Sequence, residues 1–124
     1  MRVVLVEDNA MNSELACDLL ASEGHEVEVA ASGAALRTLL AGGSCPSVIL
    51  MDISLPDADG VGLLGELREM RWLAAVPVVA LTAHALAGDE ARLLGAGFLA
   101  VITKPIDTRR FVREIERLVG ATSP

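Results

Sequence analysis

Five polar residues of this chain stand at the ends of apolar runs, and their types suit one kind of chemistry. Glu7 and Asp8 follow the first run, Asp52 follows Val-Ile-Leu-Met, Thr82 follows another, and Lys104 comes shortly after the last. If the runs are parallel strands, their carboxyl ends share one edge of a sheet, where open α/β folds bind ligands. Three acids, one hydroxyl and one ammonium are therefore expected to converge.

Crowded carboxylates repel one another. At about 5 Å and an effective dielectric of about 20, each pair costs roughly 3 kcal/mol, a large share of a typical stability of about 5–15 kcal/mol. A hard cation such as Mg²⁺ relieves this repulsion and also binds phosphate oxygens. A carboxylate can itself be a nucleophile and form an aspartyl phosphate, with Lys and Thr holding the remaining oxygens. The plainer alternative, that Asp52 only caps a loop, stays open at this point.

Five β-rich runs alternate with helical patterns along the chain. The runs are Val3–Val6, Glu26–Ala30, Val48–Met51, Val78–Leu81 and Leu99–Ile102. The second alternates apolar and charged residues, which is typical of an edge strand with one wet face, whereas the others are continuously apolar. Strict alternation of strand and helix predicts parallel strands joined by right-handed crossovers, and hence a three-layer α/β sandwich.

Apolar residues at helical spacing predict five helices. The first carries four apolar residues on its expected core face and ends at Gly24; they are Met11, Leu15, Leu19 and Leu20. The second follows Ser32, the third runs from about Val61 to Met70, the fourth from about Leu86 to Leu94, and the fifth follows Asp107 as its cap. We expect one domain over residues 1–120 and a short tail at 121–124.

Composition excludes several classes of protein. The net charge of −7 argues against a nucleic-acid surface, which needs clustered Lys and Arg. Cys17 and Cys45 lack metal-ligand spacing and indicate free thiols of a reduced compartment. No window is long and apolar enough for a membrane span or a signal peptide. We therefore expect a cytoplasmic protein with no membrane partner.

The same residues carry a resemblance to a known family. Glu7-Asp8, the run Met-Asp-x-x-Leu-Pro-x-x-Asp-Gly at 51–60, Thr82-Ala83 and Lys104-Pro105 resemble the receiver domain of bacterial two-component response regulators. The match covers nearly the whole chain and is most similar to stand-alone receivers of the DivK and CheY type and to receivers of hybrid kinases. It implies a flavodoxin-like, doubly wound (βα)5 fold with the sheet order 2-1-3-4-5.

The resemblance also implies a Mg²⁺ site. Asp8 and Asp52 would bind the ion directly, the backbone carbonyl of Ser54 would add a further ligand, and Glu7 would act through water. A Glu at position 7, where the family often has Asp, leaves metal binding intact.

For the phosphoryl group, the resemblance implies that Asp52 accepts it from the phosphohistidine of a histidine kinase or a histidine phosphotransfer protein. Lys104 would pair with the group, Thr82 would form a hydrogen bond to it, and the small Ala83 would leave access. A cis bond between Lys104 and Pro105 would aim the lysine inward. The chain would be a switch in a phosphorelay rather than an enzyme, with only self-catalysed phosphotransfer and autodephosphorylation.

One position departs from the family. Val101 stands where most members carry a Tyr or Phe that rotates on activation, so we expect this chain to switch without that rotation. The resemblance also implies that a downstream protein binds the surface formed by the fourth helix, fifth strand and fifth helix.

Two alternatives come from other classes. A metal-dependent phosphohydrolase uses a similar aspartyl phosphate but wants a second acid two residues past the nucleophile, where this chain has Ser54. A flavodoxin-like electron carrier shares the topology, yet Glu7-Asp8-Asn9 after the first strand would repel a flavin phosphate. An excised receiver of a hybrid kinase also remains open.

Overall fold

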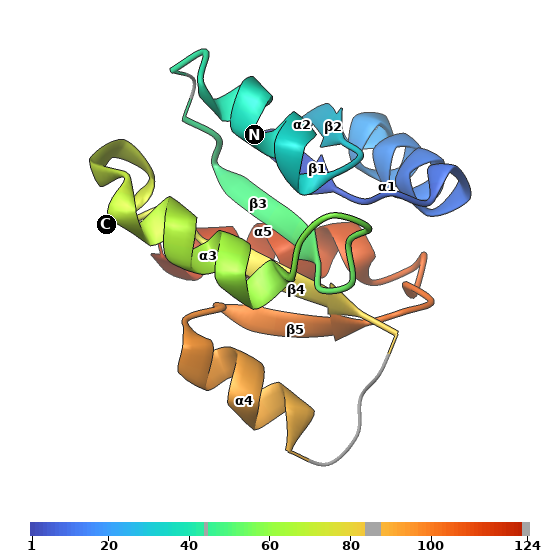
Figure 1. Ribbon diagram of the computed structural model, residues 1–124. Coiled ribbons are helices and arrows are strands. Elements are labelled where there is room, and N and C mark those ends of the chain that lie inside the picture. The colour runs from blue at the N-terminus through green and yellow to red at the C-terminus, as the bar shows by residue number, and fades with distance from the viewer. Residues whose placement is uncertain (44, 84–87, 123–124) are drawn as a thin grey trace.

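Five parallel strands form the sheet at the centre of the computed structural model, which describes residues 1–43, 45–83 and 88–122 (Figure 1). The strands are β1 (Arg2–Val6), β2 (Glu26–Ala30), β3 (Val48–Asp52), β4 (Val78–Thr82) and β5 (Ala100–Thr103). They pair in the order β2-β1-β3-β4-β5, so the alternating run Glu26–Ala30 is indeed an edge strand. The expected strand order is confirmed.

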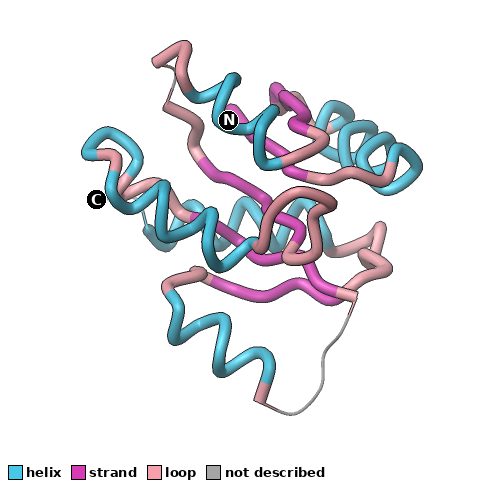
Figure 2. Tube along the Cα trace, viewed as in Figure 1, coloured by secondary structure: helices cyan, strands magenta, loops and turns pink. Residues whose placement is uncertain are grey.

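Helices cover both faces of this sheet. They are α1 (Ala10–Ser22), α2 (Gly33–Leu40), α3 (Gly60–Glu69), α4 (Asp89–Ala96) and α5 (Phe111–Thr122), with a short 3₁₀-helix, η1 (Arg71–Leu73). In the view of Figure 2, α3 and α4 lie in front of the sheet and α5 lies behind it. The predicted three-layer sandwich is therefore correct. None of the helices in the described ranges is long and apolar enough to cross a lipid bilayer.

Each strand serves two separate cores, because successive side chains point to opposite faces of a sheet. In β3, Ile49 and Met51 pack with α2, α3 and α4, whereas Val48 and Leu50 pack with α1 and α5. All five residues of β3 are buried, including the terminal Asp52. Burial on both faces explains why the central strands are continuous apolar runs in the sequence.

The strand limits agree with the predicted ones to within one residue. Several helix limits differ from the predicted ones. The described part of α4 begins at Asp89, and the predicted start near Leu86 lies outside the described residues. Helix α5 continues to Thr122, so it enters the stretch that was expected to be a tail.

The expected core face of α1 is wrong in part. Met11 is 80% exposed and Leu15 is 41% exposed, whereas Leu20 is buried as expected, and Ala16, which the prediction did not include, is buried beside it. The exposed stripe with Met11 and Leu15 and the buried stripe with Ala16 and Leu20 lie about 100° apart around the helix. The small Ala16 lets the helix lie close to the sheet.

Gly60 begins α3 where the chain folds back on the end of β3. A Cβ atom there would lie 2.9 Å from the Cα of Ile53 and 3.3 Å from the carbonyl oxygen of Asp52. We expect Gly60→Ala to lower the free energy of unfolding by about 1–3 kcal/mol, because backbone must move. Gly62→Ala is the control: its Cβ would meet nothing within 4 Å, and it should raise stability by about 0.5–1 kcal/mol. Denaturant unfolding that gave both variants the same sign would contradict this account.

Candidate functional site

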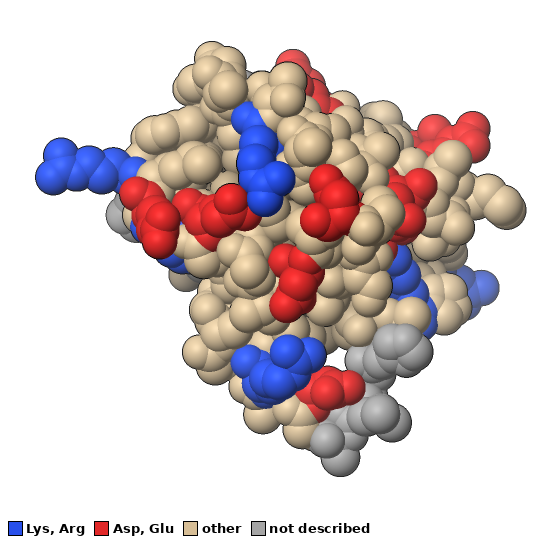
Figure 3. Space-filling view, viewed as in Figure 1, with Lys and Arg blue, Asp and Glu red and all other residues tan. Residues whose placement is uncertain are grey.

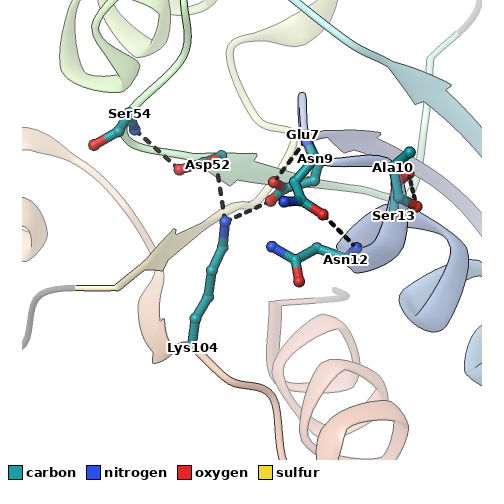
Figure 4. A network of polar contacts seen from close by, with 8 residues as sticks. All are labelled: Glu7, Asn9, Ala10, Asn12, Ser13, Asp52, Ser54 and Lys104. Carbon is teal, nitrogen blue, oxygen red and sulfur yellow. Dashed lines mark hydrogen bonds and ion pairs between the residues drawn. The ribbon is translucent and has the colours of Figure 1, made fainter.

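The carboxyl ends of four strands bring the predicted polar residues to one edge of the sheet (Figure 4). Glu7 directly follows β1, Asp52 ends β3, Thr82 ends β4, and Lys104 directly follows β5. The backbone N–H of Lys104 donates to the carbonyl of Thr82 at 2.7 Å. This bond continues the ladder between β4 and β5 by one step and fixes where the lysine side chain starts.

The Lys104 ammonium bridges two buried carboxylates. Its Nζ donates to Oε2 of Glu7 at 2.6 Å and to Oδ2 of Asp52 at 3.0 Å. Glu7 is only 3% exposed and Asp52 only 5%. Burial by itself lowers the pKa of Lys104, but the hydrogen bonds and charges of Glu7 and Asp52 outweigh it and raise that pKa above its usual value. The lysine is therefore a firmly charged cation inside the site.

Backbone groups orient both buried carboxylates. The N–H of Asn9 donates to Oε1 of Glu7 at 3.2 Å, and the N–H of Ser54 donates to Oδ1 of Asp52 at 2.9 Å. Carboxylate oxygens of Glu7, Asp8 and Asp52 all lie within 4.8 Å of one another, and Asp8 is exposed to solvent. Three hard oxygen donors with one side open to water match the preference of Mg²⁺, so the residues present fit that ion.

The remaining predicted site residues lie at or near the same edge. Thr82 is buried at the end of β4, and the exposed Ala83 follows it. Ser54 is exposed and forms an isolated β-bridge with Asp59, the residue whose side chain caps α3. The Lys104–Pro105 bond is cis, as the resemblance implied.

Val101 is set back from this edge. It lies within β5, opposite Ala80 of β4, and packs, partly buried, against the core beneath α2, α3 and α4. Its side chain therefore packs on the face of the sheet that α4 covers, and not against the polar cluster.

Asp57 has a role that the sequence did not reveal. Its carboxylate accepts hydrogen bonds from the N–H groups of Gly33 at 2.8 Å and Ala34 at 3.0 Å, at the start of α2. These two bonds lower the pKa of Asp57. An Asp directly after Pro56 is typical of a turn. No local signal could have found this contact, because its partners lie 23 and 24 residues away.

Asp8 is the one member of the carboxylate cluster without a contact to the Lys104 ammonium. We expect Asp8→Asn to stabilise the metal-free protein, by at most about 1 kcal/mol because water screens an exposed charge. Urea midpoints measured in EDTA would show it. A less stable variant would mean that Asp8 has a structural partner.

The Asp57 contact predicts a pH-dependent stability. A lowered pKa means that the carboxylate stabilises the fold above its unfolded pKa of about 4, and that this contribution disappears as pH falls through the lower folded value. Asp57→Ala should therefore have a lower thermal midpoint than the native chain at pH 7, and the difference should shrink below about pH 4. A difference that stayed constant from pH 7 to pH 3 would exclude a charged cap.

Comparison with known proteins agrees with this geometry. Residues 3–116 match the family described as the response regulator receiver domain. The chain is 40% identical, over 95% of both chains, to the polar-differentiation response regulator DivK of Brucella ovis. It is also similar to the receiver domain of the sensor histidine kinase PA1611 from Pseudomonas aeruginosa, which was solved with a magnesium ion in its active-site cleft (TM-score 0.84, 34% identity, 96% and 97% covered). The chemotaxis regulator CheY4 of Vibrio cholerae shares the fold (TM-score 0.85, 23% identity, 94% and 97% covered).

A family match across most of the chain coincides with the predicted strand order and with an acidic cluster beside a charged lysine. The chain therefore belongs to the response regulator receiver domain family, the phospho-accepting signalling switches of two-component systems.

Proposed function

We propose that Asp52 is the phosphoacceptor of this switch, and that it takes a phosphoryl group from the phosphohistidine of a histidine kinase or a histidine phosphotransfer protein. One observation carries the proposal. A buried Asp52 at the end of a central strand is paired with Lys104, and two further carboxylates lie beside it. In a receiver domain, phosphorylation of this residue would change which partner protein the domain binds.

The carboxylate cluster supports a Mg²⁺ site. Asp8 and Asp52 would hold the ion directly, together with the backbone carbonyl of Ser54. Glu7 would contribute through water, because Lys104 already contacts its Oε2 atom. When bound, the ion would neutralise negative charge on the carboxylates and on an incoming phosphoryl group. The magnesium ion bound by the related PA1611 receiver is consistent with this assignment.

Phosphotransfer would use the side chains as they lie. An oxygen of Asp52 attacks the phosphorus, the P–N bond of the donor phosphohistidine breaks, and its imidazole leaves with the bonding electron pair and takes up a proton. The ammonium of Lys104 is already 3.0 Å from Asp52, so it can pair with the phosphoryl oxygens without crossing the site. We propose that the Thr82 hydroxyl donates a hydrogen bond to the phosphoryl group. The small side chain of Ala83 would leave access to the site open.

The site favours a switch over an enzyme with an external substrate. A phosphohydrolase would need a second acid two residues after Asp52. This chain has Ser54 there, and a serine has no carboxylate to act as a general acid or base. Glu7 and Asp8 follow β1, where a flavin carrier would need a phosphate-binding loop. We therefore propose that the chain catalyses only the formation and hydrolysis of its own aspartyl phosphate.

We propose further that a downstream protein binds the surface formed by α4, β5 and α5. We also propose that the receiver domain spans residues 1–120, with a short tail at 121–124. We further propose that the protein is located in the cytoplasm. These assignments hold equally for a stand-alone receiver and for the receiver of a hybrid kinase.

Intact mass after incubation with acetyl phosphate and Mg²⁺ tests the phosphoacceptor. We expect the native chain to gain one phosphate, because Asp52 is the acid held against the charged Lys104. Asp52→Asn should gain none, whereas Asp57→Asn should still gain one. A phosphate gained by Asp52→Asn would show that another residue is the acceptor.

Val101 should change how the phosphorylated state is transmitted. A β-branched side chain is stiff about its first torsion, and this one packs against the core beneath α4. We therefore expect no side-chain rotation in β5 of the kind that a Tyr or Phe would make. The backbone after Thr82 would carry the signal instead. Residues 84–87 of that loop lie outside the described residues. With beryllofluoride as a phosphoryl mimic, amide shifts measured by NMR should be largest at 83–90. Equally large shifts at 100–102 would refute this, as would loss of phosphorylation in Val101→Ala.

A further inference from the structure

The outer face of α5 concentrates positive charge in an acidic protein. The chain has 10 Lys and Arg residues against 17 Asp and Glu, yet four arginines lie within nine positions of one another. Together with Glu114 they line a shallow hollow of about 360 Å³; they are Arg109, Arg110, Arg113 and Arg117. We call these four residues the arginine face.

Helical spacing explains why the four side chains gather. Arg109, Arg113 and Arg117 recur every four residues, so they lie one above the other on the same side of the helix and its leading turn. Phe111 and Ile115 are buried on the opposite side, against the sheet. The arginine face therefore points away from the core, and all four of its side chains are exposed.

Few ion pairs among the described residues neutralise these positive charges. Within the described residues, Arg109, Arg113 and Arg117 form no ion pair, and Arg110 approaches Asp107 only at 4.0 Å with both side chains well exposed. Glu116 is already paired with His25 at 2.9 Å. Like charges four residues apart on a helix destabilise it, so the arrangement does not serve the stability of α5.

Other basic side chains of the protein are placed differently. On the face over α2, α3 and α4, basic side chains mostly lie beside acidic ones (Figure 3). There Arg37 forms two hydrogen bonds to the carboxylate of Glu66, at 2.9 and 3.2 Å. Apart from the exposed contact between Arg110 and Asp107, the arginine face has no such partner among the described residues, so it can offer its guanidinium groups to another molecule.

We propose that the arginine face binds an acidic segment of a partner protein, in which Asp and Glu carboxylates pair with the guanidinium groups. Guanidinium forks bind carboxylates through two parallel hydrogen bonds, so four of them suit a short run of acidic side chains. Because α5 belongs to the proposed output surface, the inference rests on that proposed function and names the chemistry of the partner.

The surroundings favour a short acidic segment over nucleic acid. A neighbouring hollow between α1 and α5 carries Glu23 and Glu116 beside Arg109 and Arg113. A nucleic acid needs many cationic contacts along its length. Because the net charge of the chain is −7, the part of a long polyanion that extends past the arginine face would be repelled. A short peptide meets only the local positive field, since charges more than about 10 Å away are largely screened at moderate salt.

Fluorescence anisotropy with a labelled octaglutamate peptide tests the inference, with octaglutamine and a 12-base-pair DNA duplex as comparison probes. We expect the native chain to bind octaglutamate, with affinity that falls as salt rises, and to bind octaglutamine at least tenfold more weakly. Arg113→Gln/Arg117→Gln should weaken octaglutamate binding at least tenfold. Arg37→Gln/Arg71→Gln changes the net charge equally at exposed sites elsewhere and should weaken it less than threefold.

Three results would overturn the inference: equal loss in the two double variants, equal binding of octaglutamine, or tighter binding of the DNA duplex. Phosphate uptake from acetyl phosphate separates this question from the proposed function. Arg113→Gln/Arg117→Gln should still gain one phosphate, because neither arginine contacts Asp52. If the native chain gained none, the phosphoacceptor proposal would fail while the peptide result would stand.

Discussion

The contact of the Lys104 ammonium with Glu7 and Asp52 is the interaction on which the rest of the site depends. Two carboxylates lie almost fully buried beside each other, an arrangement that would be strongly unfavourable without a cation between them. The ammonium provides that cation, and because Lys104 is 97 residues from Glu7 it also ties the end of β5 to the end of β1. A divalent ion at the same cluster would relieve the same negative charge.

Sheet order explains why a lysine suits this position. β1 and β3 are neighbours, so Glu7 and Asp52 emerge side by side, whereas β4 separates β3 from β5. Adjacent strands are about 4.8 Å apart, so a side chain that starts after β5 must reach across β4 to meet Asp52. The long flexible stem of lysine spans that gap and ends in a compact point charge, whereas a planar guanidinium would need more room.

The loop after Asp52 is held at several points. The Ser54 N–H binds the Asp52 carboxylate, Asp57 caps the start of α2, and Asp59 caps the start of α3. Gly60 is packed so closely against Ile53 that no larger residue fits without movement. A change of charge at Asp52, the proposed acceptor, would therefore occur beside backbone groups that are tied to two helices, and these contacts would link the site to the surface.

The sequence by itself determined the alternation of strands and helices, the edge character of β2, and the polar residues at the strand ends, because these depend on local periodicity and on the meeting of parallel strands at one edge. Only the tertiary structure decided that Asp57 caps α2, that Ala16 rather than Met11 faces the sheet, and that Lys104 joins both buried acids. Each of these depends on how helices are turned or how distant loops approach one another. Such contacts join residues far apart in the chain, and no local pattern records them.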